Sequence, residues 1–250
     1  MTSELPLHVE RRGEGSPTVW LHGWSAEIGV WRDFPDIAGR ASILFDLPGH
    51  GRSPWTTDWT LDSLALEILS HIDAPADFVG WSLGGVLSIA CALADPAKVR
   101  SITILALSNF GGERAERLRD TLAKDRLRAL ADFYGAVWSD ADRSQPGFDQ
   151  LQKDLASNRR LPSAEAMLGV YRTFSAGIAS LPLAKLSCPV LAVHGTGDSV
   201  TPMSRAEEIV KRIPGARLVR IDGAGHVPFL TFPEKCREIL RGFWANPAAR

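Results

Sequence analysis

The chain has 250 residues, of which 45% are hydrophobic, and its formal net charge is −1. This length and apolar content suit a single domain around one core, and the balanced charge argues against nucleic acid as a partner. The first residues lack the apolar run of a signal peptide, and no stretch approaches the roughly 18 apolar residues of a membrane span. We therefore expect no membrane contact. Three widely spaced cysteines suit a reducing cytoplasm, where we expect the protein to lie.

Short β-rich runs alternate with helical patterns along the chain. This alternation predicts an α/β fold with a mostly parallel central sheet flanked by helices. Several of the runs are apolar throughout, as parallel strands covered on both faces are. In chain order, we expect strands at residues 7–11, 18–21, 42–45, 77–79, 101–105, 190–193 and 217–221. We expect helices at residues 61–71, 83–94, 204–212 and 233–244.

Residues 111–182 interrupt this alternation, because they show no convincing strand and many charges in helical patterns. One broad helical face collects the apolar residues Leu118, Leu122, Leu130, Phe133 and Val137. The alternation resumes near Val190. The sequence therefore predicts a core of residues 1–110 and 183–250, with residues 111–182 inserted as a helical lid between two strands of one sheet.

A Gly-Trp-Ser-Leu-Gly sequence fills residues 80–84, between a predicted strand and a predicted helix. In this context, G-x-S-x-G forms a sharp, strained turn that exposes the serine oxygen above the carboxyl end of the sheet. We therefore predict that Ser82 is a nucleophile. The alternative is a Gly-Ser turn without chemistry.

A serine hydroxyl is a poor nucleophile until a base takes its proton. Where such a turn carries a catalytic serine, the triad runs in the chain order serine, acid, histidine. His226 meets this order, in a loop after the last predicted strand, and we predict it as the base. Asp198 follows the strand at 190–193, whereas the loop 106–110 after the preceding strand holds no carboxylate. We predict that Asp198 orients the histidine; the alternatives are a surface histidine and a turn aspartate.

Acyl transfer at a serine also needs backbone N–H donors for the oxyanion. We predict the amides of Leu83 and Trp24, the latter in the Leu-His-Gly-Trp turn after an early strand, with its indole against the pocket. A purely structural turn is the alternative there. The Gly- and Pro-rich segment 46–53 is assigned to architecture. The sequence contains no phosphate loop, dinucleotide fingerprint or metal-ligand cluster, so we expect no metal and no cofactor.

Together these motifs resemble the α/β-hydrolase superfamily over nearly the whole chain. Residues 21–24, 46–53 and 80–85 further resemble the pimeloyl-acyl-carrier-protein methyl ester esterase family of biotin synthesis. The resemblance implies an α/β-hydrolase fold and a cytoplasmic, monomeric serine carboxylesterase. It implies hydrolysis of the methyl ester of a carrier-bound pimeloyl chain through an acyl-enzyme, with acyl carrier protein as partner.

In that family an aromatic lid segment lines the acyl channel, and lid arginines meet the carrier's phosphate and acidic surface. Besides Trp24, Ser82, Leu83 and His226, the resemblance thus implies substrate contacts from the matching lid segment, Phe133, Tyr134, Gly135, Ala136 and Val137. It implies carrier docking by Arg128, Arg159 and Arg160. Asp132 stands where another basic residue is expected, and a solvated helical face is the alternative for these arginines.

Other functions remain open at this point. A general short-chain carboxylesterase and a carbon–carbon bond hydrolase would use the same three residues. A serine at position 82 argues against dehalogenases and epoxide hydrolases, whose nucleophile in this superfamily is an aspartate. A receptor or scaffold on the same fold is the non-enzymatic alternative.

Overall fold

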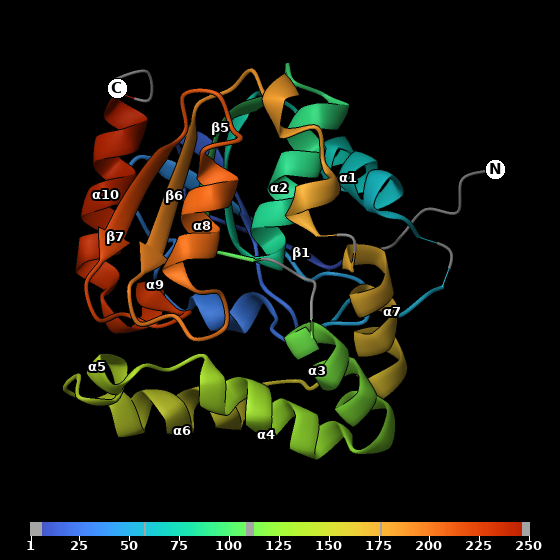
Figure 1. The fold of residues 1–250 in the computed structure, drawn as a ribbon. Coiled ribbons are helices and arrows are strands. Elements are labelled where there is room, and N and C mark those ends of the chain that lie inside the picture. Colours follow the sequence, from blue (N-terminus) through green and yellow to red (C-terminus); the bar gives the residue numbers. More distant parts are fainter. Residues whose placement is uncertain (1–6, 58, 109–112, 176, 247–250) are drawn as a thin grey trace.

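The structure is a computed structural model that describes residues 7–57, 59–108, 113–175 and 177–246. A seven-stranded sheet forms its centre, in the order β1-β3-β2-β4-β5-β6-β7 (Figure 1). Strand β1 is antiparallel to β3, and the other neighbours are parallel. The strands are β1 (Val9–Arg12), β2 (Ser16–Leu21), β3 (Arg40–Phe45), β4 (Ala76–Ser82), β5 (Val99–Leu107), β6 (Val190–Gly195) and β7 (Arg217–Ile221). The predicted α/β architecture and all seven predicted strands are confirmed.

The carboxyl ends of four parallel strands meet at one edge of this sheet. The register pairs Leu21 at the end of β2 with Gly80 in β4, and Gly195 at the end of β6 with Ile221 at the end of β7. The chain segments that follow β2, β4, β6 and β7 therefore leave the sheet at the same edge. Ser82 is the last residue of β4 and is followed directly by α2, whereas Asp198 and His226 lie in the loops after β6 and β7.

The helices of the core agree with the sequence pattern to within two residues: α1 (Leu61–Ser70), α2 (Leu83–Ala94), α8 (Met203–Val210) and α10 (Pro233–Ala245). Helices α1, α2 and α8 lie on the near side of the sheet in Figure 1. Two short helical elements, η1 (Ile28–Trp31) and α9 (Pro228–Thr231), follow β2 and the loop after β7. None of the described helices is long and apolar enough to cross a bilayer.

Between β5 and β6 the described chain forms helices joined by short loops, and we call residues 113–185 the helical insertion. Its elements are α3 (Glu113–Lys124), α4 (Arg126–Ala136), α5 (Asp140–Arg143), α6 (Phe148–Asn158), α7 (Ala164–Phe174), η2 (Ile178–Ser180) and η3 (Leu183–Lys185). Helices α4, α5 and α6 form a layer below the sheet in Figure 1. The predicted apolar face packs inward, with Leu122, Leu130, Phe133 and Val137 buried and Leu118 half-buried. The division into a core and a lid with boundaries at 111 and 182 stays a prediction.

An aromatic cluster fastens α9 to the core. The ring centroids of Trp20 and Trp31 lie 5.3 Å apart, and those of Trp31 and Phe229 lie 4.8 Å apart. All three side chains are buried. Aromatic pairs at such distances add to the stabilisation from buried area. Helix α9, which begins two residues after His226, is therefore packed against β2 through Trp31.

Candidate active site

Ser82 lies at the junction of β4 and α2. Its backbone has φ 53° and ψ −112°, an unfavourable conformation for a residue with a side chain. The junction is tight because α2 passes directly over β2: a Cβ on Gly84 would lie 1.9 Å from the carbonyl oxygen of Leu21. Only glycine fits there. The Gly-x-Ser-x-Gly sequence thus forms the strained turn that was expected.

The structure brings Ser82, His226 and Asp198 together in one hydrogen-bonded chain. His226 Nε2 lies 2.9 Å from Ser82 Oγ, and His226 Nδ1 lies 2.7 Å from Asp198 Oδ2. All three residues are buried. Because the carboxylate can only accept, Nδ1–H donates to Asp198 and Nε2 accepts from the serine hydroxyl. This is the proton arrangement that a histidine base requires.

Asp198 is kept in its ionised form by its neighbours. Burial raises the pKa of Asp198, but its interactions with His226, with His194 and with the backbone N–H of Thr201 outweigh burial and hold this pKa below its ordinary value. The second carboxylate oxygen accepts from the backbone N–H groups of Val200 and Thr201, at 2.8 and 2.9 Å. The aspartate is therefore fixed in place and charged at neutral pH.

A second buried histidine, His194, touches the same aspartate. Its Nδ1 accepts from the backbone N–H of Leu107 at 3.1 Å, so Nε2 carries the proton and donates to the carbonyl of Thr201 at 2.9 Å. Its Nε2 lies 3.4 Å from Asp198 Oδ2. Burial lowers the pKa of His194. The neutral His194 ring therefore supports the Asp198 loop through its bonds to Leu107 and Thr201. The strong hydrogen bond to Asp198 Oδ2 comes from His226.

The two predicted oxyanion donors stand at neighbouring strand ends. Leu83 is the first residue of α2, and Trp24 lies in the loop after β2. The indole of Trp24 is buried beneath the insertion, where Nε1 donates to the carbonyl of Met167 at 3.3 Å. Its ring meets Phe133 edge-on, with centroids 5.0 Å apart. The Trp24 side chain thus joins this loop to helices α4 and α7.

The loop after β2 is braced by two buried neutral histidines. His22 Nε2 accepts from the backbone N–H of Leu47 at 3.0 Å, and His50 Nε2 accepts from that of Ser25 at 3.2 Å. In each ring Nδ1 donates to a nearby carbonyl, that of Gly23 or of Pro48. Burial lowers the pKa of His22 to about 4 and that of His50 to about 3. Both rings are therefore uncharged at neutral pH, which suits their role as acceptors.

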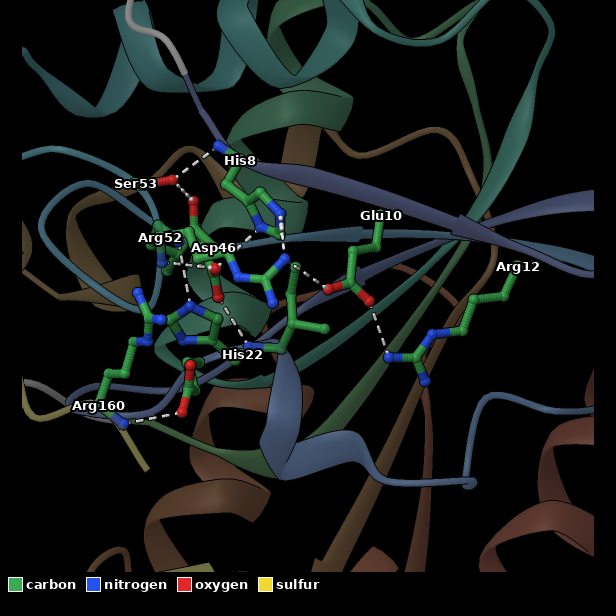
Figure 2. Close-up of polar contacts among 11 residues, drawn as sticks. His8, Glu10, Arg12, His22, Asp46, Arg52, Ser53 and Arg160 are labelled. Carbon is green, nitrogen blue, oxygen red and sulfur yellow. Dashed lines mark hydrogen bonds and ion pairs between the residues drawn. The ribbon is translucent and has the colours of Figure 1, made fainter. Parts of the chain in front are cut away.

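Asp46 completes the support of this loop (Figure 2). Its Oδ1 accepts from the backbone N–H of Ile28 at 2.8 Å, and its Oδ2 accepts from that of Arg52 at 2.9 Å. His8 Nδ1 lies 3.0 Å from the same oxygen. Residues 46–53 thus shape the chain around Trp24, as their assignment to architecture anticipated.

A cavity of about 720 Å³ lies between the insertion and the core. Its core side is formed by the loop after β2, Trp81, Val227 and Leu230, so it reaches the chain neighbours of Ser82 and His226. Apolar side chains of the insertion form the opposite wall, among them Leu127, Leu130, Val137, Trp138, Leu155 and Leu161. Its volume and apolar lining are those of a small-molecule site.

Charged groups gather on another part of the cavity wall. Glu27, Arg32, Asp154 and Arg159 all line it. Arg32 and Asp154 form an ion pair at 3.0 Å. The Arg159 guanidinium lies over the ring of Tyr134, 4.0 Å from its centroid. The cavity therefore combines an apolar wall with a polar one.

The five predicted lid residues divide between two environments. Tyr134 and Val137 line the cavity, and the Tyr134 hydroxyl donates to the carbonyl of Ser25 at 2.9 Å. Phe133 packs against Trp24. The carbonyl of Gly135 accepts from Arg143, and that of Ala136 accepts from Ser199. The segment therefore walls the cavity with part of its length and binds the core loops with the rest.

The three predicted docking arginines also differ from one another. Arg128 and Arg160 are exposed, and Arg128 Nε lies 3.9 Å from Asp132. The backbone N–H of Arg160 donates to Glu27 at 2.9 Å. Arg159, by contrast, is half-buried in the cavity wall.

In the described ranges of the chain, no group of three or more histidine, cysteine, aspartate or glutamate side chains is placed to hold a metal ion.

Comparison with known proteins places the chain in a family. Residues 18–239 match the model of the alpha/beta hydrolase family. The chain is 31% identical to the pimeloyl-[acyl-carrier protein] methyl ester esterase of Methylococcus capsulatus, over 97% of this chain and all of that protein. It is 33% identical to the protein of the same name from Neisseria meningitidis serogroup B, over 89% of this chain and 90% of the relative.

A solved structure shows the same fold. The esterase from Exiguobacterium antarcticum superimposes with a TM-score of 0.82 at 22% identity, over 95% of this chain and 94% of that one. The family match, the two relatives and this fold agree with the arrangement of strand ends and loops described above. The chain therefore belongs to the α/β-hydrolase family and is similar over nearly its whole length to esterases of that family.

Proposed function

We propose that the chain is a serine carboxylesterase with Ser82, His226 and Asp198 as its catalytic triad. We propose further that its substrate is the methyl ester of a pimeloyl chain carried by acyl carrier protein. The observation that carries the first proposal is the hydrogen-bonded chain from Ser82 through His226 to Asp198, at 2.9 and 2.7 Å. A serine beside an oriented histidine base is an activated nucleophile.

In the first half of the reaction, Ser82 Oγ attacks the ester carbonyl carbon while its proton passes to His226 Nε2. Asp198 stabilises the imidazolium through Nδ1–H. The N–H groups of Leu83 and Trp24 hold the negative oxygen of the tetrahedral intermediate. When this intermediate collapses, the bond to the methoxy oxygen breaks, and methanol leaves with the proton from Nε2. The acyl group stays on Ser82 as an ester.

In the second half, water takes the place of the serine hydroxyl. It gives one proton to His226 Nε2 and attacks the acyl carbon. A second tetrahedral intermediate then expels Ser82 Oγ, which recovers the proton. The products are the free carboxylic acid and the original enzyme. No redox partner or metal takes part in this sequence.

The choice of substrate is supported by two observations. Curated relatives of nearly the same length are pimeloyl-[acyl-carrier protein] methyl ester esterases. The cavity beside Trp81 and Val227 has an apolar wall that suits a chain of methylene groups. Its charged wall, with Arg159, suits the polar groups that follow such a chain.

A generalist esterase is the second candidate, and the arginines favour it. Asp132 stands beside Arg128, and Arg159 faces the cavity rather than the outer surface. Arg160 is exposed, but its charge acts on the nearby Glu27 carboxylate and opposes the rise that burial causes in the pKa of Glu27. A small ester that enters the cavity alone would need none of these docking contacts.

Specificity constants separate the two candidates. We expect kcat/KM for methyl pimeloyl-acyl carrier protein to exceed that for the same acyl group on pantetheine alone, and Ser82→Ala to hydrolyse neither. Equal constants for the two substrates would favour the generalist, and hydrolysis of no ester would refute both. Complementation offers an independent check. The gene should restore growth without biotin to a bacterium that lacks its own esterase, and the Ser82→Ala gene should not.

A further inference from the structure

A buried aspartate outside the proposed triad joins the helical insertion to the histidine loop. Asp142 is the third residue of helix α5, and its side chain is fully buried. Sequence patterns did not single it out. A buried carboxyl group is costly unless its oxygens accept hydrogen bonds. The donors that it has therefore indicate what it does.

Asp142 accepts from three groups, two of which belong to the core. Oδ2 accepts from the backbone N–H of Gly225 at 2.8 Å and from that of Ser139 at 2.9 Å. Oδ1 accepts from the hydroxyl of Thr231 at 2.7 Å. The carboxyl group thus ties the start of α5 both to the residue before His226 and to helix α9 after it.

Further contacts bind the same segment to the loops of the proposed triad. The backbone N–H of His226 donates to the carbonyl of Val137 at 2.8 Å, and Trp81 Nε1 donates to the His226 carbonyl at 2.7 Å. The hydroxyl of Ser199, which follows Asp198, donates to the carbonyl of Ala136 at 2.8 Å. Both loops are therefore held from the side of the insertion.

Gly225 is packed so closely that no side chain fits at this position. A Cβ at this position would lie 2.4 Å from Asp142 Oδ2 and 2.5 Å from the carbonyl oxygen of Val137. Contacts this short leave room for glycine alone. The peptide that leads into His226 is consequently clamped between the insertion on one side and Trp81 on the other.

We infer that Asp142 is a positioning residue for His226. It fixes the peptide of residues 225 and 226, so that the imidazole bridges Ser82 and Asp198 at hydrogen-bonding distance. Ala136, Val137 and Asp142 are accordingly part of the frame of the active site, whereas other residues of the insertion only line the cavity. This inference rests on the proposed triad and adds a residue from the insertion to it.

The test compares Asp142→Ala with Ser139→Ala. Both changes break the capping box of α5, in which the two side chains bond each other's backbone N–H groups. Only Asp142→Ala also removes the acceptor of Gly225 and Thr231. For folded protein and a nitrophenyl ester, we expect Asp142→Ala to lower kcat about 10²-fold, the loss typical of a catalytic group misplaced by about 1 Å. Ser139→Ala should stay within about threefold, because a lost helix cap acts on stability.

Two more variants guard against misfolding of the alanine protein. Asp142→Asn should keep most of the activity, since its amide oxygen can accept from both N–H groups and its NH₂ can donate to Thr231. Thr231→Val removes one hydroxyl at nearly constant volume and should lower kcat roughly 2- to 10-fold, the worth of one hydrogen bond. Unchanged kcat in folded Thr231→Val would overturn the inference even if the alanine variant cannot be purified.

A spectroscopic readout separates this inference from the proposed reaction. The proton on His226 Nδ1 should give a low-field NMR resonance, which needs no substrate. We expect it in the wild-type protein and in Ser139→Ala, and we expect it to broaden or disappear in Asp142→Ala. A wild-type protein without esterase activity would refute the proposed function. Unchanged kcat and an unchanged resonance in folded Asp142→Ala, beside an active wild type, would refute the positioning role alone.

Discussion

The sheet core and the helical insertion contribute different things to the same site. The core places Ser82 at the end of β4 and carries Asp198 and His226 in the loops after β6 and β7. The insertion contributes most of the cavity wall and few of the hydrogen bonds to these three residues. Changes in the core should therefore affect every substrate alike. The effects of changes in the insertion should depend on the substrate, except at Ala136, Val137 and Asp142, which contact the loops of His226 and Asp198.

The largest effect should come from the nucleophile. Ser82→Ala removes the attacking oxygen at a turn without disturbing the surrounding packing, so turnover should fall about 10⁴-fold or more for carrier-bound and small esters alike. A fluorophosphonate probe should label the wild-type protein at Ser82 alone, as peptide mass spectrometry can show. Activity retained in the alanine variant, or labelling at another residue, would refute the assignment.

The acid should rank next. Asp198→Asn keeps the shape of the side chain but leaves the wrong histidine tautomer, which should lower kcat about 10⁴-fold. Steady-state kinetics and a thermal melt of the same sample would show a large loss of kcat in a folded protein. Near-normal turnover would mean that another carboxylate orients His226.

Acid should weaken the core through the two histidines that brace the loop after β2. In the unfolded chain a histidine binds a proton near pH 6.5, whereas His22 and His50 resist until about pH 4 and about pH 3. Between these values the unfolded state binds more protons, so stability falls as the pH falls. At pH 5 the loss should be on the order of 2 kcal/mol for each residue.

Urea unfolding at pH 7 and pH 5 measures this loss. His50→Gln supplies the matched control, because its side-chain oxygen can still accept from the backbone N–H of Ser25 but does not titrate. We expect the difference between the two pH values to be smaller in this variant than in the wild type, by on the order of 2 kcal/mol. A difference as large as that of the wild type would show that His50 is not a source of the acid sensitivity.

Selectivity for chain length should respond to the insertion. Leu155 is half-buried on α6 and lines the cavity. Leu155→Trp should shorten the space for an acyl chain, and even one methylene group is worth roughly 10-fold or more in a fitted pocket. The ratio of kcat/KM for octanoyl and acetyl nitrophenyl esters measures the change. An unaltered ratio would mean that the acyl chain lies elsewhere.

The smallest effect should come from the exposed cations. Arg128→Glu and Arg160→Glu should lower kcat/KM for a carrier-bound ester through slower association, and salt should reduce the effect because exposed charges are screened over about 8–10 Å. Hydrolysis of a nitrophenyl ester should hardly change. Lys235→Glu, on α10 of the core, is the control. Arg159→Glu should instead affect both substrates, because Arg159 lines the cavity.

Sequence patterns predicted the parts of the site that follow local rules. The strand ends could be read from apolar runs, and the positions of Ser82, Asp198 and His226 follow from those ends; their catalytic roles stay predictions. His194 and Asp142 could not be found this way, because their partners lie far along the chain. The burial of the Trp24 indole beneath Met167 likewise depends on how the insertion packs, which no periodic pattern encodes.

At Ser82 the backbone conformation that places the nucleophile also lowers the stability of the fold. A side chain held at φ 53° and ψ −112° costs about 1–3 kcal/mol. Ser82→Gly relieves this cost, and the greater freedom of glycine in the unfolded chain offsets only about 0.5–1 kcal/mol of the gain. A protein without a nucleophile should therefore melt at a higher temperature than the active one. Because Ser82→Gly has no attacking hydroxyl, it could hold an intact ester for crystallography, and the relaxed turn should make it the more stable protein for that use.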